Sequence, residues 1–139
     1  MVIRLQAAGL CVVVACLSIA WPAAAAGKYD GSTPMLCAVT ALSECTADGK
    51  CERSAPQEGN TLPTFIRVDL GAKTLSTTDG SGRKTEIKSS NTIDGQLILQ
   101  GIENGKAWNM VVKSDTGRWG GSVVEDDGSF ALFGSCTLP

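Results

Sequence analysis

Residues 94–117 read DGQLILQGIENGKAWNMVVKSDTG, and this stretch decides the fold class. Two runs rich in apolar side chains flank the central motif Asn104-Gly105, which suits the positive φ angles of a type I′ turn. In the second run Trp108, Met110 and Val112 alternate with other residues, so they share one face of an extended chain. The stretch therefore predicts a β-hairpin with one apolar face.

The same pattern of short apolar runs and turn motifs continues in both directions from this hairpin, and no segment has useful helical periodicity. The runs that predict strands are 35–45, 51–53, 64–70, 74–77, 85–93, 96–102, 107–113, 118–124 and 129–138. Short strands at regular spacing are typical of an antiparallel meander. We therefore expect an all-β domain, a small up-and-down, lipocalin-like barrel or half-barrel of about seven to eight strands. A two-sheet β-sandwich is the alternative.

The N-terminal residues 1–26 have the layout of a cleavable secretory signal peptide. Arg4 is followed by an apolar run from Leu5 to Ile19, and four alanines precede Gly27. A membrane-spanning helix needs about 20 apolar residues, more than this run supplies. Cys16 loosely fits a lipoprotein processing site, but apolar residues follow it. We expect residues 27–139 to form a single β domain, bacterial and periplasmic or secreted, without a membrane span after cleavage.

The charge balance of the expected mature chain excludes several classes of function. Only Arg4 of the 12 Lys and Arg residues lies in the leader, which leaves 11 basic against 14 acidic residues and a net charge of −3. A mildly acidic chain without a basic patch argues against nucleic acid as a partner. The chain has no histidine, which excludes a Ser-His-Asp or Cys-His site and histidine metal ligands.

Four cysteines remain after the leader: Cys37, Cys45, Cys51 and Cys136. An even number in a short exported chain predicts disulfides, and three pairings are possible. Cys45 and Cys51 flank a segment containing Asp48-Gly49, whose turn would place them opposite each other on two strands. This favours a Cys45–Cys51 pair and leaves Cys37 with Cys136. The spacing contains no CxxC pair, which argues against zinc.

Three short motifs have a catalytic or metal-binding interpretation, but each is better explained as a turn. Ser81-Gly82-Arg83-Lys84 spells S-x-x-K, which requires a helix, whereas a glycine-rich turn is expected here. Asp115-Thr116-Gly117 matches the triplet of aspartic proteases and is also an ordinary hairpin turn. Glu125-Asp126-Asp127 lacks the alternating ligand spacing of a calcium loop. We therefore expect no catalytic residue, no metal ligand and no cofactor.

The large aromatic side chains allow three interpretations. In a small barrel they fill the core, because about eight strands leave just enough room for side chains. They could instead line an apolar ligand pocket or form an exposed patch for a partner. Core packing is the favoured interpretation for the set Phe65, Trp108, Trp119, Phe130 and Phe133.

Several segments together resemble a group of small exported proteobacterial proteins of unassigned function. These segments are 65–70 (FIRVDL), 94–101 (DGQLILQG), 106–108 (KAW), 114–117 (SDTG) and 133–137 (FGSCT). The resemblance spans about residues 36–136 and implies a periplasmic or secreted protein, with no catalytic or binding residues to transfer. A broader likeness to periplasmic lysozyme-inhibitor barrels is limited to size, compartment, disulfides and β content.

These observations predict a non-enzymatic binding or inhibitor-like module of the cell envelope. Its partner would be an unidentified protein or a small apolar ligand. The alternative is a structural or stress-related envelope protein without a specific ligand. An open barrel mouth or a contiguous apolar patch would favour binding, and a filled barrel with a polar surface would favour the structural alternative.

Overall fold

The computed structural model describes residues 28–56 and 62–139, so the predicted signal peptide over residues 1–26 lies outside the described residues. The described residues form nine β-strands and no helix, and therefore no helix that could cross a membrane. The strands are β1 (Met35–Thr46), β2 (Cys51–Ser54), β3 (Phe65–Asp69), β4 (Thr74–Thr77), β5 (Lys84–Ile93), β6 (Gln96–Glu103), β7 (Lys106–Lys113), β8 (Arg118–Val124) and β9 (Gly128–Thr137). The all-β prediction is confirmed.

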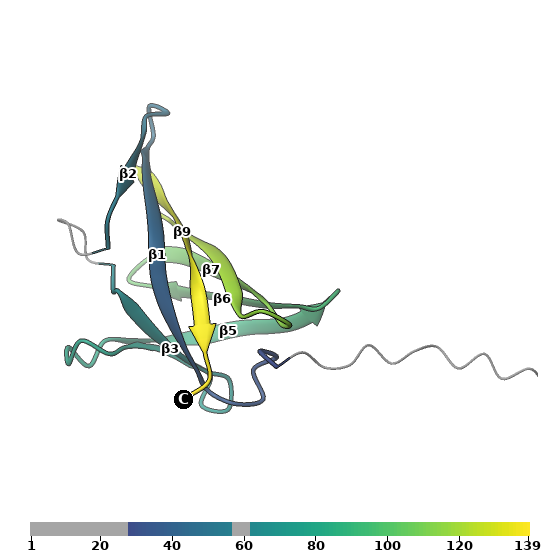
Figure 1. The fold of residues 1–139 in the computed structure, drawn as a ribbon. Helices are drawn as coiled ribbons and strands as arrows, with labels where there is room; N and C mark the ends of the chain where they lie inside the picture. Colours follow the sequence, from purple (N-terminus) through teal and green to yellow (C-terminus); the bar gives the residue numbers. More distant parts are fainter. Residues whose placement is uncertain (1–27, 57–61) are drawn as a thin grey trace, which may run out of the picture.

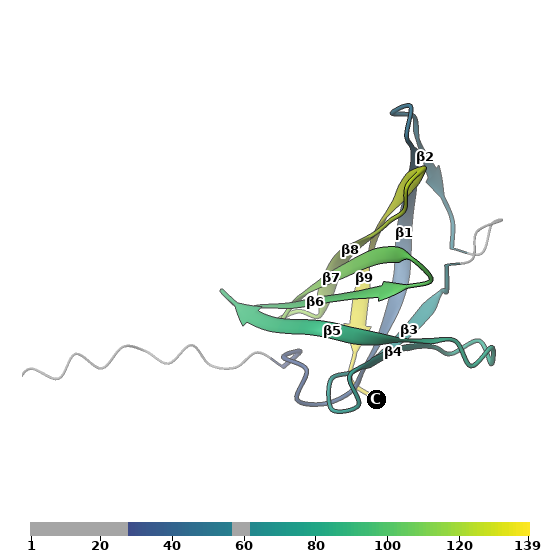
Figure 2. The same ribbon diagram turned by 180° about the vertical axis from the view of Figure 1, so that it is seen from behind.

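The strands close into a barrel because the first long strand, β1, pairs with the last, β9. Neighbouring strands are antiparallel, and the circuit runs β1-β3-β4-β5-β6-β7-β8-β9 and back to β1. Figures 1 and 2 show β1 and β9 side by side, with β5 and β6 crossing them steeply on the opposite wall. The described residues thus form a closed eight-stranded barrel, the first of the two predicted architectures.

The ninth strand, β2, is an extension of the barrel wall. One edge of β1 serves two partners: its first residues pair with β3, and Leu42 to Cys45 pair with β2. The β1–β2 hairpin therefore projects beyond the barrel (Figure 1). A register shift between Val39 and Ala41 interrupts the β1–β9 pairing at mid-length, and irregularities of this kind bend and twist a strand.

The turns follow the local sequence signals. Asn104 and Gly105 have φ angles of 50° and 81°, as expected for a type I′ turn between β6 and β7. Asp94 and Gly95 have φ angles of 50° and 72° in the turn between β5 and β6. These short turns keep consecutive strands adjacent in the wall.

One end of the barrel is closed by the residues just before β1 and after β9. The backbone N–H of Tyr29 donates to the carbonyl oxygen of Ser114 at 2.8 Å, and Tyr29 and Leu138 pack against the core. Gly117 has a φ of 72°, and a Cβ there would lie 2.9 Å from the Tyr29 ring. Only glycine therefore permits both this turn and the close approach of Tyr29.

Two disulfides hold the wall together. Cys37 and Cys136 face each other in the β1–β9 pairing and are bonded inside the barrel, with Cys37 fully buried. Cys45 and Cys51 are bonded across the β1–β2 hairpin at the surface. This is the pairing that the turn geometry favours. Disulfides persist in oxidising compartments, so they indicate a location outside the cytoplasm.

Candidate ligand-binding site

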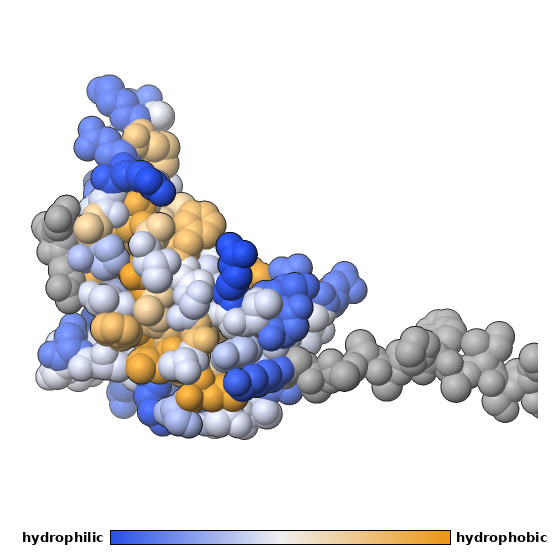
Figure 3. All heavy atoms as spheres, viewed as in Figure 1, coloured by the Kyte–Doolittle hydropathy of each residue, from blue (hydrophilic) through white to orange (hydrophobic). Residues whose placement is uncertain are grey.

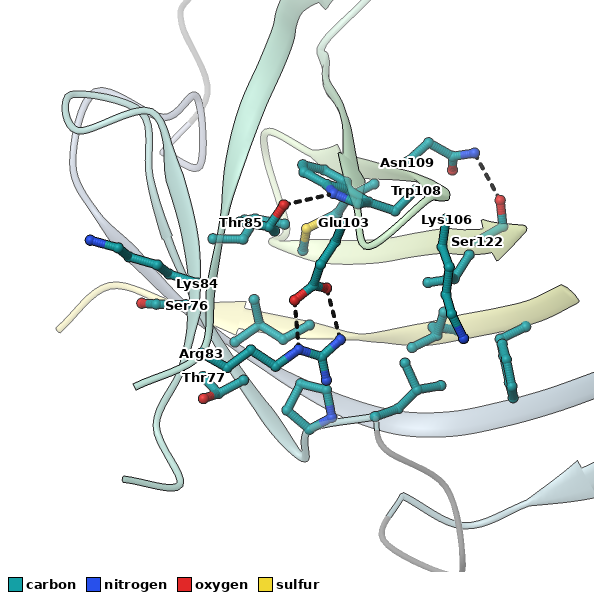
Figure 4. A pocket seen from close by; sticks show the side chains of 18 of the residues that line it. Ser76, Thr77, Arg83, Lys84, Thr85, Glu103, Lys106, Trp108, Asn109 and Ser122 are labelled. Carbon is teal, nitrogen blue, oxygen red and sulfur yellow. Dashed lines mark hydrogen bonds and ion pairs between the residues drawn. The ribbon is translucent and has the colours of Figure 1, made fainter. Parts of the chain in front are cut away.

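The end of the barrel opposite Tyr29 contains a cavity of about 430 Å³. Its rim includes Leu62 and Pro63 before β3, Arg83 just before β5, and Asn104 in the β6–β7 turn. Inward-facing side chains of the barrel strands line the interior (Figure 4). The apolar lining consists of Leu62, Pro63, Ile66, Leu75, Trp108, Met110, Trp119, Val123, Phe130 and Leu132.

The cavity exists because two tryptophans lie against the wall instead of filling the centre. A Cβ at Gly101 on β6 would lie 2.2 Å from the ring of Trp108 on β7. A Cβ at Gly134 on β9 would lie 2.6 Å from Nε1 of Trp119 on β8. Each indole therefore lies over a neighbouring strand at a position without a side chain, and the space at the barrel mouth stays open.

Both indole N–H groups are satisfied within the wall. Trp108 Nε1 donates to Oγ1 of Thr85 at 3.3 Å, which Figure 4 shows, and Trp119 Nε1 donates to the carbonyl oxygen of Ala38 at 3.1 Å. A tryptophan whose N–H is already bonded offers mainly its apolar ring surface to a ligand. Both rings are nearly buried and form part of the lining.

A third inward position without a side chain lies beside the cavity. Gly121 pairs with Leu132 on β9 and with Met110 on β7, both of which line the cavity. A Cβ there would lie 2.4 Å from the carbonyl oxygen of Asn109. The side chains of Asn109 and Ser122 are bonded to each other at 2.8 Å beside this position (Figure 4).

The polar groups of the site gather at the mouth. Arg83 binds Glu103 with two parallel hydrogen bonds, Nε to Oε1 and a terminal nitrogen to Oε2, both at 2.7 Å. Figure 4 shows the two side chains pointing toward each other. The hydrogen bonds from Arg83 lower the pKa of Glu103, and the same bonds raise the pKa of Arg83. Both groups are therefore ionised at neutral pH, in a geometry that favours strong pairing.

A second ion pair lies beside the first. Lys106 binds the carboxylate of Glu125, which follows β8. The side chain of Lys106 is 42% exposed and lines the cavity, whereas that of Glu125 is 22% exposed. Lys106 also contributes to lowering the pKa of Glu103, so the two ion pairs interact electrostatically.

The five aromatic residues weighed together in the sequence occupy three different environments. Trp108 and Trp119 are buried and Phe130 is half-buried, and all three line the cavity. Phe65 and Phe133 are 45% and 56% exposed. For these two residues the expected core packing is wrong, because they occupy outward positions of β3 and β9.

The outer surface of the barrel around Phe133 carries few charged side chains. Phe133 pairs with Ala41 on β1 and with Gly120 on β8, and a Cβ at Gly120 would meet its ring at 3.3 Å. The ring therefore covers a backbone position without a side chain. Figure 3 shows apolar and neutral side chains over the middle of this face, with hydrophilic ones at its edges.

The three motifs weighed as chemical sites form turns or ion pairs. Ser81 Oγ lies 2.6 Å from Oδ1 of Asp79 and 2.9 Å from Oγ1 of Thr77, in the loop between β4 and β5. Hydrogen bonds donated to Asp79 by the hydroxyls of Ser81 and Thr77 lower the pKa of Asp79 to about 2. Residues 115–117 form the turn between β7 and β8, and Glu125 pairs with Lys106. The described segments hold no group of three or more metal-ligating side chains.

Sequence reasoning did not single out the residues at the mouth. Glu103 and Lys106 flank the Asn104-Gly105 turn and face each other in the register of β6 and β7, so their proximity was accessible from the turn. Arg83 is 20 residues away from Glu103 along the chain. The antiparallel β5–β6 hairpin, which turns at Asp94 and Gly95, places the start of β5 beside the end of β6 and so brings Arg83 to the same rim.

Comparisons with protein families, curated proteins and solved structures give no match for this chain.

Proposed function

We propose that this protein is a non-enzymatic binding protein of the periplasm or extracellular space, which holds a small apolar ligand at the mouth of its barrel. The observation that carries the proposal is the open cavity of about 430 Å³ lined by Trp108, Trp119 and other apolar side chains. Its size lies within the range of roughly 300–1,000 Å³ found for small-molecule sites.

The alternative structural role is less well supported because small barrels are normally filled. Eight strands leave an interior just wide enough for side chains. Here Gly101, Gly121 and Gly134 occupy inward positions, and two indoles lie against the wall. Leaving such space empty forfeits packing contacts that a purely structural domain would use for stability.

The charged groups at the mouth support binding rather than proton transfer. The pKa of Glu103 is lowered by its bonds with Arg83. A general acid or base works best when its pKa lies near the operating pH. An ion pair held in this way instead supplies a fixed polar rim around an apolar interior.

The extracytoplasmic location rests on two independent features. The two disulfides are typical of an oxidising compartment. Residues 1–26 have the layout of a secretory signal peptide, which supplies the route of export.

The test is a titration of the purified protein with N-phenyl-1-naphthylamine, a neutral apolar probe that fluoresces when it leaves water. We expect saturable binding at one site per chain. Val123 faces inward between Trp108 and Phe130, so Val123→Phe should fill the mouth and abolish binding. Val124→Phe is the matched control, because the neighbouring Val124 is 48% exposed.

The proposal fails under two results. One is the absence of saturable probe binding by the wild-type protein. The other is equal binding by wild type and Val123→Phe, when circular dichroism shows that the variant is folded.

A further inference from the structure

We infer that the natural ligand is a single-chain amphiphile with an anionic head, whose chain occupies the cavity and whose head binds at Lys106. This inference rests on the proposed function and names the ligand class for the same site. It follows from how polar and apolar groups are distributed along the cavity, and from which hydrogen-bonding groups remain available at the mouth.

The cavity has one apolar zone and one charged zone. Deep positions are lined by Leu75, Met110, Trp119 and Leu132, whereas Glu103 and Lys106 lie at the mouth. A ligand that matches this lining carries its polar group at one end only. A methylene group takes nearly the volume of a water molecule, about 30 Å³, so the cavity accommodates roughly 14 such groups. This number is an upper limit, because the head group occupies the mouth, so a chain of about ten carbons fits the apolar zone.

The charged groups at the mouth leave N–H donors unused, while the carboxylate of Glu103 is already neutralised by Arg83. Both carboxylate oxygens of Glu103 already accept bonds from Arg83. The ammonium group of Lys106 has three N–H donors, of which Glu125 engages one within the described residues. The Lys106 side chain is also 42% exposed, so a ligand can reach it from solvent. A head group that accepts hydrogen bonds and carries negative charge therefore fits this position.

Three carboxylates interact with the cations at the mouth. Glu125 faces Lys106, and Glu103 and Asp79 act on Arg83. Glu125 therefore competes with an anionic ligand for Lys106. Removing Lys106 and removing Glu125 should have opposite effects on the binding of an anion, and neither should change the binding of a neutral molecule with the same chain.

The experiment measures displacement of N-phenyl-1-naphthylamine by decanoate, 1-decanol and decylamine at pH 8, below their micellar concentrations. We expect decanoate to bind about tenfold more tightly than 1-decanol, as one charge-assisted hydrogen bond allows. Lys106→Gln should remove this preference and Glu125→Gln should increase it. Lys113→Gln is the matched control, since Lys113 is an exposed lysine at the other end of β7.

The outcomes separate this inference from the proposed function. If 1-decanol or decylamine binds as tightly as decanoate or more tightly, while the probe still binds in the cavity, the ligand does not need an anionic head. The proposed binding function would then still stand. An unchanged preference for decanoate in Lys106→Gln overturns the assignment of the head to Lys106. Failure of the probe itself to bind refutes the proposed function and this inference with it.

Discussion

The two disulfides should contribute unequally to stability because they close loops of very different length. Cys37 and Cys136 are separated by 99 residues, and Cys45 and Cys51 by 6. In the chain-entropy model, cross-linking a loop of about 100 residues contributes about 4.7 kcal/mol, and the short loop about 2 kcal/mol. We therefore expect Cys37→Ala/Cys136→Ala to lose roughly twice as much stability as Cys45→Ala/Cys51→Ala.

Burial acts in the same direction. Cys37 is fully buried and Cys136 is 7% exposed, so their replacement by alanine also removes packed sulfur atoms from the core. Cys51 is exposed and Cys45 is half-buried, on a hairpin that projects beyond the barrel. Large-to-small changes cost more where the surroundings cannot collapse.

The assay is equilibrium urea unfolding of the two double variants and the wild type, followed by tryptophan fluorescence, because Trp108 and Trp119 are buried. Free energies are extrapolated to zero urea for each protein separately, because removing a cross-link expands the unfolded state and should raise the m-value, more for the longer loop. Equal losses in the two variants, or a larger loss for Cys45→Ala/Cys51→Ala, would refute the loop-length argument.

Two further changes test the walls of the site. Gly101→Ala should destabilise the protein by about 1–3 kcal/mol, because the added Cβ would lie 2.2 Å from Trp108 and 2.6 Å from the carbonyl oxygen of Glu86. Thermal unfolding measures the loss. Gly71→Ala is the control, because a Cβ at Gly71 would approach no atom closer than 3.4 Å. Pairing with Arg83 lowers the pKa of Glu103 in the folded state below its ordinary value of 4.5. The ion pair therefore stabilises the folded protein fully above pH 4.5, and this contribution is lost as the pH falls through the lowered pKa of Glu103. Glu103→Gln should therefore be less stable than wild type at pH 7 and converge with it in acid, and a constant difference from pH 7 to pH 2 would contradict this assignment.

The strands and turns were predictable because their signals are local. Asn104-Gly105 adopts positive φ angles wherever it occurs in a tight hairpin, and the alternation around Trp108 assigns one face of β7 to the interior. The disulfide pairing was accessible for a related reason. The turn after Cys45 places Cys51 opposite it, which leaves Cys37 for Cys136.

The environment of the aromatic side chains was not predictable from these local signals. Period-two alternation separates the two faces of a strand but does not say how a large ring lies over its neighbours. Trp108 avoids the barrel centre because Gly101 on the adjacent strand leaves room for its ring. Phe133 differs from the tryptophans, because the alternation with Leu132 along β9 already assigns it to the outer face; only its contact with Gly120 depends on the neighbouring strand.

By itself, the sequence determined the β class of the domain, the position of each turn and the absence of histidine chemistry, because these depend on composition or on residues close together in the chain. The tertiary structure alone decided that β9 closes onto β1, that β2 remains outside the circuit and that the barrel mouth is hollow. These features depend on pairing between distant strands and on the packing of rings over glycines, and no local pattern encodes either.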